Sequence, residues 1–324
     1  MNFPFNVYLL AFLGAGATTA LTLPLWRGWC RRTGLVDDPG HRKIHHTPVP
    51  LAGGLAVLTG LIVPLLCGVV VMKLFLADSS AGFALTHGFA RRAPELLAIV
   101  LGAVGMTFIG WLDDKHEVRP AFKFGGQLVV ALLVAAAGVR ITLFVPSAVF
   151  SYAVTILWIL AVTNALNFMD NMNGLCAGLG AIGAWCFAVL AASDGQYLVA
   201  LLALLGCGAL LGFLPYNFPN ASAFLGDAGS HLVGYLLAVL AILPHFFTRE
   251  NPHPLAVLSP LLILAVPLGD LAWVVLLRWK MGKPFYVGDT NHLSHRLVRR
   301  GHTNTSAVLL IWLLAVVCGG LALL

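Results

Sequence analysis

Two adjacent acids and a lysine mark the segment GWLDDKHEVRPAFKFGGQ. Asp113 and Asp114 follow a hydrophobic run, and Lys123 and Gln127 open the next run four residues apart, on one face of a helix. Adjacent carboxylates can bind Mg²⁺ or accept a proton, and a lysine at a helix N-terminus offers a phosphate both charge and backbone donors. The competing interpretation is a solvated loop with interfacial charges.

A second segment, TNALNFMDNMNGL, carries amides and one acid at regular intervals. Asn164, Asn167, Asp170 and Asn173 recur every third residue, and this spacing predicts one side of a helical stretch. Such a side can hydrogen-bond a nucleobase, a ribose or a metal-bound water. Asn and Asp also commonly end one helix and cap the next, but four of them in register favour a functional site.

A third segment, PYNFPNASAFLGDAGSHLVGYLL, places Asn217 and Asp227 on either side of a loop that ends in small residues. Gly226 and Gly229 allow close backbone approach to a ligand, and the N-terminus of the following helix attracts phosphate. Asp227 can bind Mg²⁺ or cap that helix. Capping by Asp227 or Ser230 alone is the competing interpretation.

A fourth segment, RWKMGKPFYVGDTNHLSHRLVRRGH, combines His292, His295 and Arg296 with further arginines. This set of donors suits a diphosphate or phospholipid headgroups, whereas zinc is disfavoured because Cys or carboxylate partners at ligand spacing are lacking. Asp270 lies within an apolar run, where an ionisable group is costly, so we expect a functional or helix-pairing residue. A supporting role falls to the first polar loop, with Asp37, Asp38, Arg42, Lys43, His45 and His46.

The elements that position these residues follow from composition. Of 324 residues, 10% are charged and 59% are hydrophobic, and the mean hydropathy is +0.90. An ordinary soluble domain has roughly 25% charged residues, so a soluble enzyme, a disordered chain and a nucleic-acid-binding module are excluded. We predict an all-α, polytopic integral membrane protein with a single domain, residues 1–324, whose net charge of +6 reflects loop topology.

Ten stretches are apolar and long enough to cross a bilayer, which takes roughly 20 residues. They are 5–26, 51–72, 96–112, 124–139, 145–163, 175–192, 196–214, 228–247, 255–277 and 303–324. The fourth is short, so the fourth and fifth could instead form a re-entrant pair. Most Lys and Arg residues fall in the odd-numbered connections, and the positive-inside rule therefore predicts that these loops are cytoplasmic and that both termini are outside.

In this order, GWLDDK…KFGGQ, NALNFMDNMNGL, GDAGS and HLSHRL resemble the motifs of the polyprenyl-phosphate N-acetylhexosamine-1-phosphate transferases, over residues 35–300. Within that family, the chain resembles the undecaprenyl-phosphate GlcNAc-1-phosphate transferase branch. The resemblance implies Mg²⁺-dependent (or Mn²⁺-dependent) transfer of a sugar 1-phosphate from a UDP-sugar to undecaprenyl phosphate, with release of UMP. This is the first membrane step of a cell-envelope polysaccharide, at the cytoplasmic face of the cell membrane. The implied partners are the lipid, the nucleotide sugar and the bilayer, without nucleic acid; a homodimer is left open.

The resemblance also implies roles for individual residues. The catalytic positions match Asp113, Asp114, Asp170 and Lys123, and the magnesium ligand matches Asp227. The substrate-binding positions match Asn167, Asn173, Asn217, His292, His295 and Arg296. The chain departs from the family at Asn173, where a second aspartate of a D-x-x-D-G run is usual, and at Ser294, where HLHHRL is common.

Two other functions stay open at this level. Phospho-N-acetylmuramoyl-pentapeptide transferase belongs to the same family, but its loop typically carries a run of histidines. A secondary transporter of an anionic metabolite would place ionisable groups at mid-membrane, where only Asp270 is found here. In the transferase reaction one phosphoanhydride breaks and another forms, so the protein chiefly positions two phosphates and neutralises their charge. Direct attack and a covalent phosphosugar on an aspartate are both compatible with the sequence.

Overall fold

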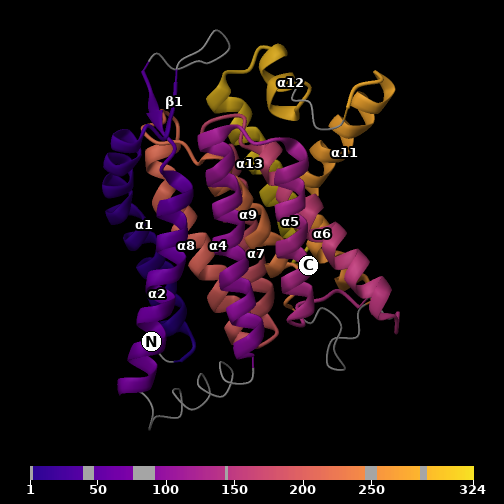
Figure 1. Ribbon diagram of the computed structural model, residues 1–324. Helices are drawn as coiled ribbons and strands as arrows, with labels where there is room; N and C mark the ends of the chain where they lie inside the picture. Colours follow the sequence, from indigo (N-terminus) through magenta and orange to yellow (C-terminus); the bar gives the residue numbers. More distant parts are fainter. Residues whose placement is uncertain (1–2, 39–46, 76–91, 143–144, 245–253, 285–289) are drawn as a thin grey trace.

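The computed structural model describes residues 3–38, 47–75, 92–142, 145–244, 254–284 and 290–324, which form a bundle of helices (Figure 1). The longer helices are α1 (Phe5–Thr33), α2 (Gly53–Phe75), α4 (Ala93–His116), α5 (Pro120–Ala136), α6 (Ala148–Met169), α7 (Leu175–Ser193), α8 (Tyr197–Asn217), α9 (Gly226–Leu240), α11 (Ala265–Lys280) and α13 (Asn304–Leu321). The shorter elements are β1 (Val36–Asp37), β2 (Val49–Pro50), η1 (Pro254–Leu258), α10 (Ser259–Ile263) and α12 (Leu293–Arg299).

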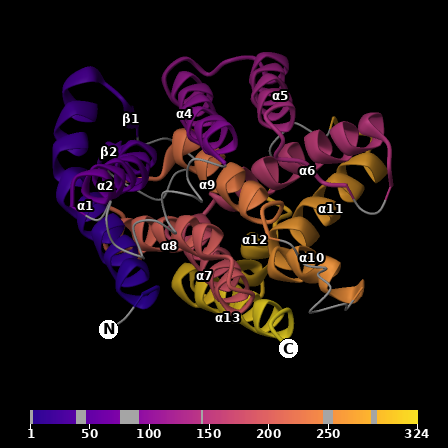
Figure 2. The same cartoon turned by 90° about the horizontal axis from the view of Figure 1, so that it is seen from below.

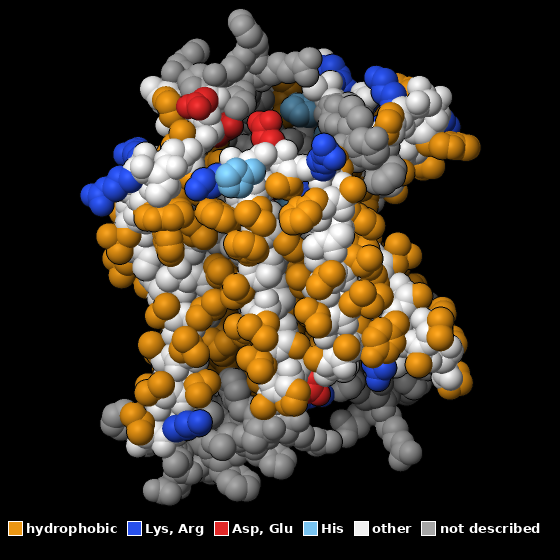
Figure 3. Space-filling view, viewed as in Figure 1, with side chains coloured by type: hydrophobic (Ala, Val, Ile, Leu, Met, Phe, Trp, Pro, Cys, Tyr) orange, Lys and Arg blue, Asp and Glu red, His pale blue; other side chains and the backbone are white. Residues whose placement is uncertain are grey.

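The architecture is that of an all-α membrane protein. In the described part of the chain, seven helices are long and apolar enough to span a bilayer, and a bent pair of helices makes an eighth candidate. Figure 3 shows a broad apolar belt with charged side chains gathered above and below it. Each of the ten predicted spans overlaps a helix in the described residues, but α5, α9 and α11, with 17, 15 and 16 residues, are shorter than the seven spanning helices. Ten crossings and the side of each terminus stay predictions.

The ninth predicted span is not one helix. The stretch 255–277 is divided between η1, α10 and α11, and the axes of Ala256–Ile263 and Ala265–Lys280 differ by 68°. Pro267 has no N–H to donate to the carbonyl of Ile263, so the helical hydrogen bonds are interrupted at this point. The predicted ninth span is therefore present as a bent pair of helices.

Helix α9 lies at the centre of the bundle (Figure 2) and packs against α2, α4, α6, α7 and α8. Every one of its residues except Asp227 is buried. Close packing requires glycine on α4, since a Cβ at Gly110 would collide with the backbone of Asp227. Further along the same interface, the hydroxyl of Tyr235 donates to the carbonyl of Ile99 over 3.0 Å. These contacts fix the height and rotation of α4 against α9.

The loop before α9 is held by the N-terminal part of the chain. The strands β1 and β2 pair antiparallel, with Val36 opposite Pro50. The N–H of Phe224 donates to the carbonyl of Pro50 over 3.0 Å, and Gly53 donates back to the carbonyl of Phe224 over 2.9 Å. The start of α9 is thus attached to the start of α2 by backbone hydrogen bonds.

Candidate active site

Asp114, near the end of α4, caps the first turn of α9. Its two carboxylate oxygens accept hydrogen bonds from the backbone N–H groups of Asp227 and Ala228, over 2.7 and 3.0 Å. Leu225, which precedes α9, supplies no side-chain cap of its own. A carboxylate at a helix N-terminus is also stabilised by the helix dipole. Gly110 allows this contact because it lies one turn before Asp114 and admits the α9 backbone.

The adjacent acid, Asp113, faces a different partner. Lys123, in the first turn of α5, donates to Asp113 Oδ2 over 2.7 Å and to Asp227 Oδ2 over 2.5 Å. The ammonium therefore joins carboxylates from α4 and α9. Burial alone would lower the pKa of Lys123, but the charges of Asp227 and Asp113 and their hydrogen bonds raise it above its ordinary value. All three side chains keep some exposure, so the site is open to a ligand.

Helix α6 completes the cluster from a third side. The side-chain amide of Asn167 donates to Asp227 Oδ1 over 2.8 Å and to Ser230 Oγ over 2.9 Å. Asp170 follows directly after α6, and burial raises its pKa well above the ordinary value, as do the charges of Asp227 and Asp114. The structure thus brings together four of the predicted acids and Lys123, although Asp113 and Asp227 are more than a hundred residues apart in the sequence.

The oxygen donors of this cluster match the coordination preference of Mg²⁺. Within the described residues, no three His, Cys, Asp or Glu side chains converge on one metal position. Mg²⁺ is usually held by one or two carboxylates together with substrate phosphates and waters. Asp227 and Asp113 provide two carboxylates that already share one cation, the Lys123 ammonium. The residues therefore fit a magnesium ion that is completed by the phosphates of a substrate.

The predicted face of four polar residues is only half helical. Asn164 and Asn167 lie on α6, which ends at Met169, while Asn173 lies in the turn that follows. The chain reverses there because Gly174 adopts φ 75°, a conformation that favours glycine. The side chain of Asn173 donates to the carbonyl of Pro219 over 3.0 Å. The regular spacing therefore does not put Asn173 on the same face as Asn167.

Two other residues of this region, Asn217 and Gly226, also make contacts within the protein. Asn217 is buried at the end of α8, where it accepts from the N–H of Gly174 (2.7 Å) and donates to the carbonyl of Ala223 (3.0 Å). Its side chain therefore joins two loops of the protein. Gly226, where we expect close approach of a ligand, also leaves room for the carboxylate of Asp114. His231 is buried, as expected, with its Nδ1 2.6 Å from the carbonyl of Asp227.

The histidine-rich segment forms the short helix α12, whose N-cap is His292. Its ring packs edge-on against Phe168 of α6, with centroids 5.6 Å apart, and its centroid is 6.3 Å from that of His295. The guanidinium of Arg296 lies 4.7 Å from the ring centre of Trp273. His292, His295 and Arg296 are thus neighbours, as predicted. Arg42, Lys43, His45 and His46 fall outside the described residues.

Sequence reasoning missed several residues that position the site. Ser294 is fully buried, and its hydroxyl donates to Asn171 Oδ1 over 2.6 Å, which joins α12 to the loop after α6. Arg278 is also buried and lies 5.1 Å from the ring centre of Phe168. In the sequence, Arg278 lies near the end of an apolar run, where a basic residue indicates only membrane topology. Asn171 lies among the polar residues that recur every third position but does not itself fit that spacing, so the pattern did not indicate a role for it.

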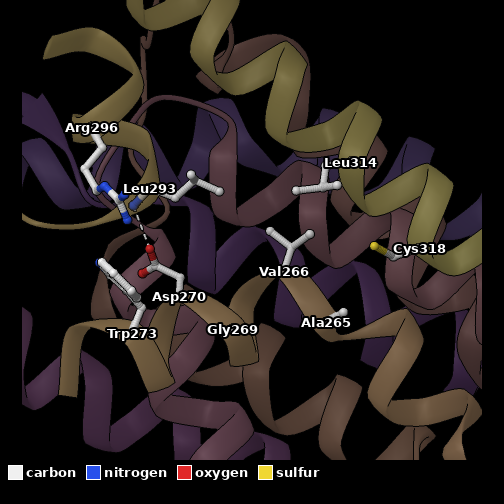
Figure 4. Close-up of a pocket in the computed structure, with 9 residues that line it drawn as sticks. All are labelled: Ala265, Val266, Gly269, Asp270, Trp273, Leu293, Arg296, Leu314 and Cys318. Atoms are coloured by element: carbon white, nitrogen blue, oxygen red, sulfur yellow. Dashed lines mark hydrogen bonds between the residues drawn. The ribbon is translucent and has the colours of Figure 1, made fainter. Parts of the chain in front are cut away.

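A cavity of about 300 Å³ lies beside α12, between α11 and α13 (Figure 4). Asp270, Trp273 and Arg296 close its polar end, and Leu293 lies next to them. The rest of the wall is apolar, with Ala265, Val266, Gly269, Leu314 and Cys318. The cavity therefore connects a charged end at α12 with the hydrophobic part of the bundle.

Comparison with known proteins agrees with this arrangement. A family model described as Glycosyl transferase family 4 matches residues 96–245, from α4 to just beyond α9. The chain is 31% identical over 314 residues to the probable undecaprenyl-phosphate N-acetylglucosaminyl 1-phosphate transferase of Bacillus subtilis (strain 168). This match covers 94% of the chain and 81% of the relative. The chain belongs to glycosyl transferase family 4. The resemblance stated from the motifs is thereby confirmed, and the protein is a membrane transferase.

Other relatives of this family 4 transferase carry names of the same type. It is 34% identical over 336 residues to the decaprenyl-phosphate N-acetylglucosaminephosphotransferase of Mycobacterium leprae (strain TN), covering 96% of the chain and 81% of the relative. It is 27% identical over 323 residues to the undecaprenyl-phosphate alpha-N-acetylglucosaminyl 1-phosphate transferase of Escherichia coli (strain K12), covering 94% and 80%. Both matches extend across the four polar segments, far beyond residues 96–245.

Proposed function

We propose that this family 4 transferase moves N-acetylglucosamine 1-phosphate from a UDP-sugar to undecaprenyl phosphate and releases UMP. The observation that carries the proposal is the Lys123 ammonium held between Asp113 and Asp227, with Asn167 on the far side of Asp227. A cation among carboxylates and amides suits a reaction between two phosphates. The names of the relatives supply the sugar and the prenyl phosphate.

Mg²⁺, or Mn²⁺ in its place, would be held by Asp227 and Asp113 with the substrate diphosphate. Bound there, the ion would draw negative charge away from the phosphorus under attack. The Lys123 ammonium lies next to Asp113 and Asp227, the carboxylates that would bind the ion. In the proposed reaction it contacts the phosphate that leaves with UMP. The metal ion and Lys123 would together keep positive charge next to the phosphoanhydride bond that breaks.

The remaining residues orient the reactants. Asp114 holds the first turn of α9, so it sets the position of Asp227 and acts through it. Asp170 has a raised pKa and is therefore suited to accept a proton from the lipid phosphate. In a double displacement an aspartate would instead attack the sugar phosphate first. Asn167 fixes the rotamer of Asp227 by its hydrogen bond.

The acceptor's prenyl chain requires an apolar path that ends at the polar segments. The cavity between α11 and α13 has apolar walls and a charged end at Arg296, so it is suited to a stretch of prenyl chain with its phosphate towards α12. The polar segments would face the cytoplasm, as the positive-inside rule predicts. A reaction between charged groups therefore takes place at the edge of a hydrophobic bundle.

The decisive experiment uses purified full-length protein in lipid nanodiscs with undecaprenyl phosphate and a panel of UDP-sugars. We expect UMP and a lipid-linked sugar diphosphate with UDP-N-acetylglucosamine, dependent on Mg²⁺ or Mn²⁺ and abolished by EDTA. A product only with the UDP-N-acetylmuramoyl-pentapeptide would move the chain to the peptidoglycan branch. UMP release that is unaffected by EDTA would remove the metal from the proposal, and the absence of product with every donor would refute the function.

A further inference from the structure

Asp270 is the buried acid of the broken ninth span, and the proposed reaction gives it no role. Its side chain is 1% exposed. Both of its carboxylate oxygens are used by the N-terminal end of α12: His292 Nδ1 lies 2.7 Å from Oδ2, and the N–H of Leu293 donates to Oδ1 over 2.6 Å. In Figure 4 the carboxylate points from α11 towards α12. The buried carboxylate of Asp270 is thus paired with the N-terminal end of α12.

Helix α12 depends on contacts of this kind for its position. It has seven residues, and isolated helices shorter than about 12 residues are marginal in water. His292 provides no side-chain cap, so Asp270 supplies the acceptor for the first N–H from another helix. One turn along α11, Trp273 lies under the guanidinium of Arg296. On the other side, Ser294 donates to Asn171 beside the active-site loop.

The same carboxylate determines which nitrogen of His292 carries the proton. A carboxylate at Nδ1 favours the form in which Nδ1 is a donor, and this leaves Nε2 as the nitrogen that can contact a substrate. Phe168, edge-on to the ring at 5.6 Å, limits its rotation. The position of α12 and the tautomer of His292 are therefore both set from α11.

We propose that Asp270 is a positioning residue: it holds α12 in place and keeps the proton of His292 on Nδ1, so that Nε2 is presented to the substrate. The proposal rests on the proposed function in one respect, the contact of His292 with the substrate. Asp270 itself touches no reacting atom. The break at Leu264 lets α11 leave the direction of α10 and bring Asp270 beneath α12.

A double-mutant cycle in the full-length protein tests this role. Asp270→Asn keeps an acceptor for the N–H of Leu293 but turns a donor towards His292 Nδ1, so it reverses the tautomer. We expect Asp270→Asn and His292→Ala each to lower kcat about 10- to 100-fold, and the double variant to be no slower than His292→Ala within about twofold. Ser259→Ala, at a buried site on α10, serves as the matched control and should keep the wild-type rate.

A spectroscopic measurement separates this inference from the reaction itself. In protein labelled with ¹⁵N-histidine, the signal missing from His292→Ala identifies the ring, and its Nδ1 should be protonated in the wild type and bare in Asp270→Asn. Losses that multiply in the double variant, or a ring whose Nδ1 is bare in the wild type, would overturn the proposal. If the wild type releases no UMP while Nδ1 carries the proton, the proposed function fails and the positioning role of Asp270 stands.

Discussion

Replacing Asp114 should lower the stability of the protein, whereas replacing Asp113, the adjacent acid of α4, should remove its activity. In Asp114→Asn, one oxygen still accepts from the start of α9, but the new amide N–H faces the N–H of Asp227 or Ala228. The loss of one hydrogen bond to a charged group, with a backbone donor left unpaired, costs about 2 to 3 kcal/mol. In Asp113→Asn, the acceptor for the N–H of Val118 is retained. The hydrogen bond from Lys123 is weakened, but Lys123 keeps Asp227 as its partner, and a carboxylate crowded by Asp227 is removed.

For a chain of this size, about 2 to 3 kcal/mol corresponds to a fall in Tm of about 3 to 4 °C. Heating with a thiol-reactive dye can follow this, because Cys30, Cys176, Cys186 and Cys207 are buried in the folded protein. We expect Asp114→Asn to show this fall, and Asp113→Asn to change Tm by less than about 2 °C while UMP release is lost. Equal Tm values for the two variants would refute the assignment of Asp114 as the cap of α9.

Three other substitutions test the cluster and α12. Lys123→Ala should abolish UMP release at ordinary Mg²⁺ and regain part of it at high Mg²⁺, measured by titration of the metal; a normal rate would exclude contact with phosphate. Asp227→Asn should abolish UMP release at every Mg²⁺ concentration with an unchanged elution profile, and retained activity would exclude it as a ligand. Ser294→His should lower Tm and activity with every donor sugar, because Ser294 is fully buried; a folded variant with a changed donor preference would contradict this.

Hydropathy predicted the helices correctly because a bilayer demands long apolar runs. The distribution of Lys and Arg predicted in turn that the polar segments lie on one side and meet there. Asp113, Asp170 and Asp227 do lie together, although each comes from a different segment. The break at Leu264 was visible only as Pro267, and proline is also tolerated inside membrane helices.

The division of labour within the cluster could not be predicted from residue types. A carboxylate is equally suited to bind a metal and to cap a helix. Asp113 and Asp114 are adjacent in the sequence, and only the rotation of α4 against α9 makes Asp114 the cap of α9 and Asp113 the partner of Lys123. Asn173 and Asn217 likewise have the chemistry of nucleotide ligands, yet the structure uses their amides to join loops. Spacing along a chain does not reveal which backbone groups need a partner.

The packing of α4 on α9 links the chemistry to the depth of the membrane. Asp113 and Asp114 are consecutive on one helix, so any turn or slide of α4 moves both together. The contact between Tyr235 and Ile99 lies about 20 Å along α4 from these acids, at 1.5 Å per residue. A bilayer of the wrong thickness, or a detergent that tilts α4, would therefore slow turnover before any helix melts.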